Sequence, residues 1–193
     1  MHGHDVLINK ISKLSDLEDR VLIEIGTTRE VLNEQDSSYK LSKFCESRGM
    51  DFITVDMDQE NTDNINQRWS NEGIKSVAIT RKGEEFLDDY EGVIDFLYLD
   101  AFDFYHENHS LKRIDKYKTI LNTTINNEEC YRMHLECCVN SIDKINIGGY
   151  ICIDDSFGVE FDGKGKTAIP YLLDNGFIID TMENKCILLK KVK

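Results

Sequence analysis

Acidic side chains stand at or near the ends of four apolar runs in this sequence. The runs cover residues 21–25, 52–56, 93–100 and 150–155, and their acids are Glu24, Asp56, Asp100, Asp154 and Asp155. A strand buried on both faces of a parallel sheet is continuously apolar, and ligands in open α/β sheets bind beyond the carboxyl ends of the strands. A single acid there is often only a turn or cap residue. As a set, these five predict one cleft at the edge of a sheet.

Asp56 has the most specific chemistry of the five. A carboxylate at the end of a second strand can accept hydrogen bonds from the two vicinal hydroxyls of a ribose. Asp56, with Met57 directly after it, therefore predicts a site for a nucleoside-containing cofactor. Asp58 is the competing ribose acceptor, but a role as the cap of the following helix is favoured for it.

The turn after the first apolar run narrows the choice of nucleoside. A dinucleotide fingerprint needs several glycines so that the backbone can approach a pyrophosphate. Here only Gly26 is present, followed by Thr27 and larger residues, and Glu30 and Glu34 would repel a diphosphate. This turn argues against a nicotinamide cofactor.

S-adenosylmethionine fits the same turn better, because it has no phosphate, carries a sulfonium cation and ends in a zwitterion. We expect Glu24 to complement its positive groups, and Gly26 and Thr27 to contact it. The amides at a helix start near Ser37 or Ser38 would hold its carboxylate.

The elements that must position these residues follow from alternating strand and helix patterns. Strands are expected at residues 21–25, 52–56, 76–80, 93–100, 150–155, 177–180 and 186–191. Helices are expected at residues that include 4–19, 37–49, 59–71, 83–90, 127–145 and 166–174. Gly148-Gly149 is expected to terminate the helix 127–145. Alternation of this kind predicts a parallel sheet. The loop between the last two strands is too short for a crossover helix, so they must pair antiparallel. We predict an α/β fold with seven strands, the last antiparallel.

Composition sets the broad class. The 193 residues suit a single domain, 1–193, in which 1–20 form a helical lead-in. The net charge of −13 and basic residues that gather only in the tail 190–193 predict no nucleic-acid partner.

No apolar run approaches the ~20 residues of a membrane span, and nothing resembles a signal peptide, so we expect a cytoplasmic protein without a membrane partner. The six cysteines are expected to be buried thiols, and nothing indicates an oligomer.

The pattern as a whole resembles the class I S-adenosylmethionine-dependent methyltransferases over nearly the full chain. The matching segments are 24–26 for the glycine turn, 55–56 for the ribose acid, 94–100 and 148–155 for the fourth and fifth strands, and the closing strand pair. This resemblance implies a Rossmann-like, doubly wound sheet and methyl transfer from S-adenosylmethionine.

Asp100, Asp154 and Asp155 would concentrate negative charge at two neighbouring strand ends, which favours a bound divalent cation. In these positions the sequence is similar to metal-dependent small-molecule O-methyltransferases of the catechol and macrolide-sugar types. By that resemblance the three aspartates hold Mg²⁺, and the ion binds and activates a hydroxyl of a small-molecule acceptor. The glycine-containing segment 156–165 is expected to be a mobile loop over the cleft.

The general base is left open between Asp103 and His106. The sugar-methylating relatives place a histidine three residues after the first metal aspartate, where this chain has Asp103. His106 and His109 could supply a titratable imidazole, whereas His134 is expected to be a partly buried helix residue. Two alternatives stay open: a metal-independent O- or N-methyltransferase with Asp100 or Asp103 as base, and a non-catalytic ligand-binding or regulatory domain on the same fold.

Overall fold

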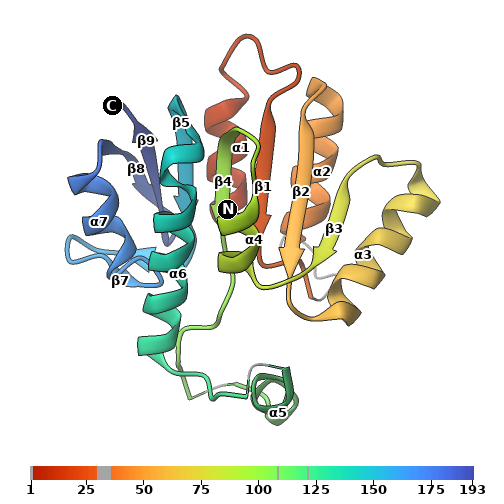
Figure 1. Ribbon diagram of the computed structural model, residues 1–193, viewed down its shortest axis with the longest axis vertical. Coiled ribbons are helices and arrows are strands. Elements are labelled where there is room, and N and C mark those ends of the chain that lie inside the picture. Colours follow the sequence, from red (N-terminus) through yellow and green to blue (C-terminus); the bar gives the residue numbers. More distant parts are fainter. Residues whose placement is uncertain (1, 30–35, 108, 121) are drawn as a thin grey trace.

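Seven strands form one sheet at the centre of the molecule (Figure 1). The computed structural model describes residues 2–29, 36–107, 109–120 and 122–193. The strand order is β3-β2-β1-β4-β5-β9-β8, and β1 to β5 are parallel to one another. The strands are β1 (Val21–Ile25), β2 (Asp51–Asp56), β3 (Val77–Thr80), β4 (Ile94–Leu99), β5 (Ile145–Ile153), β8 (Phe177–Glu183) and β9 (Cys186–Lys191).

The last strand, β9, lies between β5 and β8 and is antiparallel to both. This arrangement confirms the predicted fold class, a Rossmann-like doubly wound sheet of seven strands whose last strand is antiparallel. The physical reason is the short connection from β8 to β9, which leaves no room for a crossover helix.

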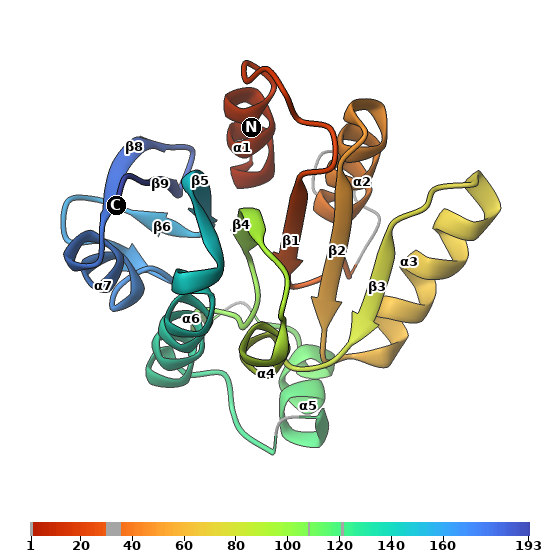
Figure 2. The same ribbon diagram turned by 45° about the horizontal axis from the view of Figure 1, so that its top comes forward.

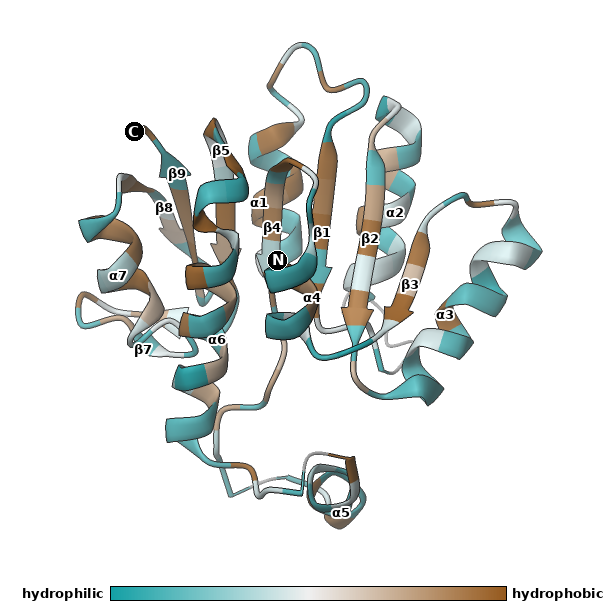
Figure 3. Ribbon diagram, viewed as in Figure 1, coloured by the Kyte–Doolittle hydropathy of each residue, from teal (hydrophilic) through white to brown (hydrophobic). Residues whose placement is uncertain are grey.

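Helices cover both faces of the sheet because successive strand residues point to opposite sides. Leu22 belongs to a buried cluster with α1 (Gly3–Ile11), α2 (Ser37–Arg48) and α3 (Gln59–Glu72). Its neighbour Ile23 belongs to a second cluster with α4 (Gly83–Asp89), α6 (Asn127–Ser141) and α7 (Ala168–Asp174). Hydrophobic residues are concentrated on the strands, and hydrophilic residues on the outer sides of the helices (Figure 3).

One helix, α5 (Leu111–Ile120), stands apart from both layers, beyond the carboxyl ends of the central strands (Figure 1 and Figure 2). It carries Lys112, Arg113, Lys116 and Lys118 against the single acid Asp115. The expectation that basic residues gather only in the C-terminal tail therefore overlooks a positively charged helix next to the strand ends.

Two boundary predictions are wrong for local reasons. Gly148 and Gly149 do not terminate a helix but lie inside β5, where the register against β4 shifts and Gly148 has a φ of +88°; glycine often marks such irregularities in strands. The first helix ends at Ile11 instead of residue 19. It could not extend to residue 19, because Asp16 and Asp19 adopt left-handed backbone conformations that a helix excludes.

Two further predictions concern burial and membranes. All six cysteines are buried and unpaired, as expected. Within the described ranges, no helix is long and apolar enough to cross a membrane.

Candidate functional site

A cavity of about 1010 Å³ opens at the carboxyl ends of β1, β2, β4 and β5. The predicted site residues that line it are Gly26, Thr27, Asp56, Met57, Asp100, Asp103, His106, Asp154 and Asp155. Residues of α5 line the cavity as well. Sheet topology thus brings together side chains from distant parts of the chain, as the rule for ligand sites in open α/β sheets leads one to expect.

Glu24 and Ser38 are not among the lining residues, because they are buried behind the turn. Glu24 accepts hydrogen bonds from the hydroxyls of Ser37, Ser38 and Thr54, each at 2.6 Å. Burial raises the pKa of Glu24 to about 7, although the three hydroxyl donors oppose the shift. In the structure Glu24 and Ser38 tie the start of α2 to β1, and their contacts with a cofactor stay a prediction.

Gly26 is required by the close approach of the chain after β4. It has a φ of +105°, and a Cβ at this position would lie 2.5 Å from the carbonyl oxygen of Asp100. Its N–H donates to the carbonyl of Val55 at 2.8 Å. Only glycine fits here, and the result is a tight turn whose next residue, Thr27, borders the cavity.

Asp56 holds this turn with its carboxylate. Its Oδ2 accepts from the N–H of Thr27 at 3.1 Å and from Asn61 Nδ2 at 3.2 Å, and its Oδ1 accepts from the N–H of Asp58 at 2.8 Å. Burial raises the pKa of Asp56. A carboxylate can accept about four hydrogen bonds, so these contacts leave one position on Oδ1 for a ligand hydroxyl instead of the two ribose contacts predicted.

Asp58 caps α3, as predicted, by accepting from the N–H of Glu60 at 3.1 Å. It also forms an ion pair with Lys116 of α5. The acid that competed with Asp56 for a ribose is thus occupied in holding a helix start and in linking α5 to the body of the protein.

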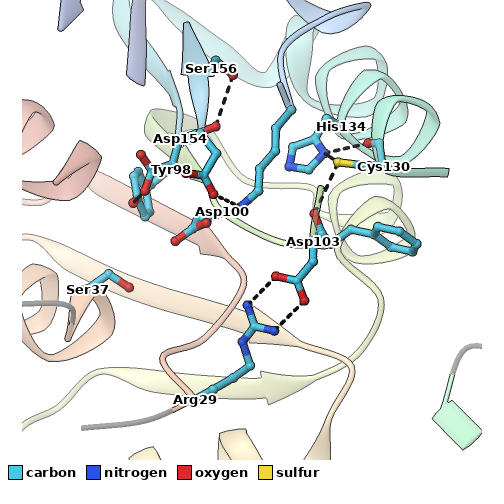
Figure 4. A network of polar contacts seen from close by, with 12 residues as sticks. Arg29, Ser37, Tyr98, Asp100, Asp103, Cys130, His134, Asp154 and Ser156 are labelled. Atoms are coloured by element: carbon cyan, nitrogen blue, oxygen red, sulfur yellow. Dashed lines mark hydrogen bonds and ion pairs between the residues drawn. The ribbon is translucent and has the colours of Figure 1, made fainter. Parts of the chain in front are cut away.

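Asp103 is neutralised by two arginines and does not have the properties of a general base. Arg29 binds it in a bidentate manner, at 3.0 and 3.1 Å (Figure 4). Arg113 Nε lies 2.9 Å from its Oδ2. Tyr117 donates a further hydrogen bond at 3.0 Å. Burial alone would raise the pKa of Asp103, but the arginines outweigh it and hold the pKa well below its usual range. The ion pair with Arg29 instead connects the β1 turn to the segment after β4.

The histidines differ in their surroundings. His106 is exposed at the cavity and stacks on His109, with ring centroids 3.7 Å apart. His134 is fully buried in α6, where its Nδ1 lies 2.7 Å from the carbonyl of Cys130. Burial lowers the pKa of His134 to about 3, so this imidazole is neutral near pH 7.

Of the residues predicted from the first turn, Glu30 and Glu34 lie outside the described residues.

Lys164 occupies the place predicted for Mg²⁺. Its Nζ forms ion pairs with Asp100 and, at 3.2 Å, with Asp155, and the side chain is 2% exposed. Among the described residues, no group of three or more His, Cys, Asp and Glu side chains is arranged to hold a metal ion. An ammonium already compensates part of the negative charge of these carboxylates and would repel a divalent cation at such short range. The residues present do not fit the predicted ion, and the Mg²⁺ site of Asp100, Asp154 and Asp155 is not supported.

Asp154 is the most enclosed carboxylate of the three. It accepts a hydrogen bond from the hydroxyl of Tyr98 at 2.7 Å (Figure 4). Burial and the neighbouring charge of Asp100 raise the pKa of Asp154 to about 7. Burial would lower the pKa of Lys164, but the surrounding aspartates outweigh it and raise that pKa, so the lysine remains charged.

Sequence reasoning missed Lys164 because it treated residues 156–165 as a mobile loop. The segment contains instead a short antiparallel pair, β6 (Ser156–Phe157) and β7 (Asp162–Gly163), which delivers Lys164 into the cavity. The available signal was a lysine between two glycines, shortly after two of the predicted metal aspartates, Asp154 and Asp155. The three negative charges of Asp100, Asp154 and Asp155 also call for a positive charge, which a nearby basic side chain of the same chain can supply.

No protein-family model matches the sequence, and no curated protein matches it. Solved structures do share its fold. One is a structure from Clostridium thermocellum that is assigned by inference as an rRNA methylase. Its TM-score is 0.64 at 10% sequence identity, and the match covers 100% of this chain and 98% of that protein's chain. An rRNA methylase from Streptococcus thermophilus has a TM-score of 0.56 at 17% identity, with coverages of 99% and 95%. SMU.1697c from Streptococcus mutans, in complex with SAH, has a TM-score of 0.61 at 11% identity, with coverages of 98% and 96%.

The chain has the Rossmann-like methyltransferase fold. At these identities the likeness concerns the fold of class I S-adenosylmethionine-dependent methyltransferases, and the small-molecule O-methyltransferase subtype is not supported by it. The presence of rRNA methylases among these neighbours contradicts the expectation of a small-molecule acceptor without any nucleic-acid partner. That expectation relied on the net charge of the whole chain, which conceals the positive helix α5 beside the cavity.

Proposed function

We propose that this protein transfers a methyl group from S-adenosylmethionine to an acceptor bound in the cavity at the strand ends. The observation that carries the proposal is the pairing of the Gly26 turn with Asp56, whose carboxylate holds the N–H of Thr27 and keeps one acceptor position open. The methyltransferase fold and the SAH bound to one structural neighbour support the same cofactor.

Within this proposal, Gly26, Thr27, Asp56 and Met57 bind the cofactor. Asp100 follows β4, lines the same cavity and keeps 30% side-chain exposure. The base is left unassigned in this proposal, because Asp103 is paired with two arginines and Asp100 is paired with Lys164.

We propose RNA as the acceptor class. Lys112 and Lys118 of α5 are exposed, and Lys112 lines the cavity. Positive side chains beside a reaction site bind the phosphate backbone of nucleic acids, and two structural neighbours are described as rRNA methylases. The other basic residues that line the cavity from α5, Arg113 and Lys116, are engaged with acids of the body of the protein.

Isothermal titration with S-adenosylmethionine tests the cofactor, and transfer of a labelled methyl group to RNA tests the acceptor. We expect Asp56→Ala to weaken cofactor binding at least about tenfold, because a charged hydrogen-bond acceptor is lost. Asp63→Ala, which removes an exposed acid of α3, is the matched control and should bind like the wild type. Absence of cofactor binding by the wild type would refute the proposal. Methyl transfer that reaches proteins or small metabolites but no RNA would refute the acceptor class alone.

A further inference from the structure

Lys164 is held rigidly at both ends. Its backbone N–H donates to the carbonyl of Asp155 at 3.1 Å, and the next N–H, of Gly165, donates to Ser156 Oγ at 2.8 Å. At the other end, its ammonium contacts Asp100 and Asp155. A long side chain fixed in this way acts as a permanent part of the site instead of a mobile surface charge.

The flanking glycines allow this placement. A Cβ at Gly163, which has a φ of +92°, would lie 1.8 Å from the carbonyl oxygen of Asp155, and a Cβ at Gly165 would lie 2.3 Å from Ile169. Gly163 excludes a larger side chain because its backbone is left-handed and the contact is with backbone, whereas at Gly165 the side chain of Ile169 would have to move. The backbone can therefore pass close enough to the end of β5 for the lysine to reach across to Asp100, which follows β4.

The charges around the ammonium are those of a cation site. Asp100 and Asp155 contact it directly, and Asp154 contributes a third carboxylate close enough to influence it electrostatically. Oxygen ligands of this kind suit Mg²⁺ or Mn²⁺. The positive charge here comes from the protein itself, and it lies within a side chain that is 2% exposed.

We propose that Lys164 is a built-in counter-ion that takes the place of a divalent metal between the ends of β4 and β5. It compensates part of the charge of the aspartates, holds the two strand ends together and excludes divalent cations from the site. The proposal goes beyond methyl transfer and does not depend on it, because its test measures metal binding only.

Titration of the full-length chain with Mn²⁺, followed by electron paramagnetic resonance of the free ion, tests this role. We expect no specific Mn²⁺ binding by the wild type and binding of one ion by Lys164→Met, at least about a hundredfold tighter, because removal of the ammonium exposes the aspartates to the ion. Lys166→Met is the matched control, since Lys166 is an exposed lysine two residues away that pairs with Asp162. It should behave like the wild type.

Thermal unfolding gives a second readout, because a ligand that binds only the folded state raises the Tm. Mn²⁺ should raise the Tm of Lys164→Met and leave that of Lys166→Met unchanged. A folded Lys164→Met that does not bind Mn²⁺ overturns the proposal. If Lys164→Met does not fold with or without Mn²⁺, the titration of the wild type decides. Binding of Mn²⁺ by the wild type that is weakened by Asp155→Asn overturns the proposal. Absence of Mn²⁺ binding by the wild type supports it.

Discussion

Two groups of acids at the same edge of the sheet are compensated in different ways. Glu24, at the end of β1, accepts hydrogen bonds from three neutral hydroxyls. The aspartates that follow β4 and β5 surround the ammonium of Lys164. Neutral donors satisfy the oxygens of a carboxylate but do not balance its charge, whereas an ammonium does both.

The difference shows that an acid near a strand end is not automatically available to a ligand. Glu24 faces α2, on the opposite side of the sheet from Ile23 and Ile25, and is fully buried there. Asp100 comes after its strand, at the open edge, and lines the cavity. In the register of β1 and β4, Glu24 lies level with Tyr98, whereas Asp100 follows the last residue of β4. The position along the strand, and not the face of the sheet, separates the structural acid from the candidate site acid.

Removal of the ammonium should produce the largest loss of stability. We expect Lys164→Met to lower the free energy of unfolding by about 3–5 kcal/mol near pH 7 without added metal, because the clustered aspartates lose the buried ammonium that compensates them. Urea unfolding measures the effect. Lys166→Met removes an exposed lysine and should unfold at the same urea concentration as the wild type. Equal midpoints for the two variants would show that Lys164 does not compensate its aspartates.

The hydroxyl-compensated acid should instead show itself in the pH dependence of stability. Burial raises the pKa of Glu24 from 4.5 to about 7, so the folded state disfavours the ionised form and the protein loses stability as pH rises from about 4.5 to about 7. The loss is on the order of 3 kcal/mol for this shift. We expect Glu24→Gln to remove most of that loss between pH 5 and pH 8 in urea unfolding.

The control for this measurement is Glu18→Gln, which changes an exposed glutamate and should leave the pH profile of the wild type intact. A Glu24→Gln variant whose stability still falls by the wild-type amount would mean that the three hydroxyls hold the carboxylate charged at little cost.

A third form of compensation, the pair of Arg29 and Asp103, should give the smallest effect. Arg29 is 36% exposed at its side chain, so solvent screens part of the interaction. We expect a coupling energy of about 1–2 kcal/mol from a double-mutant cycle of Arg29→Ala and Asp103→Ala in urea unfolding. Additive single effects would indicate that Arg113 alone is sufficient to neutralise Asp103.

Local patterns in the sequence were enough to determine the scaffold. Continuous apolar runs predicted the buried parallel strands, and the short connection before residues 186–191 predicted the antiparallel β9, because strand burial and loop length are local properties. The same patterns placed Asp56 and Asp100 at the carboxyl edge, where both line the cavity. Asp58 as a helix cap was also readable from its position alone.

Only the tertiary structure decided what each acid contacts. Lys164 reaches Asp100 across 64 residues of sequence, and Arg29 reaches Asp103 across 74. Such contacts depend on how loops pack over the sheet and leave no periodic signal in the chain. The physical reason is that a charge takes its character from its nearest partners in space, and for Glu24, Asp103 and the aspartates around Lys164 those partners are set by the fold.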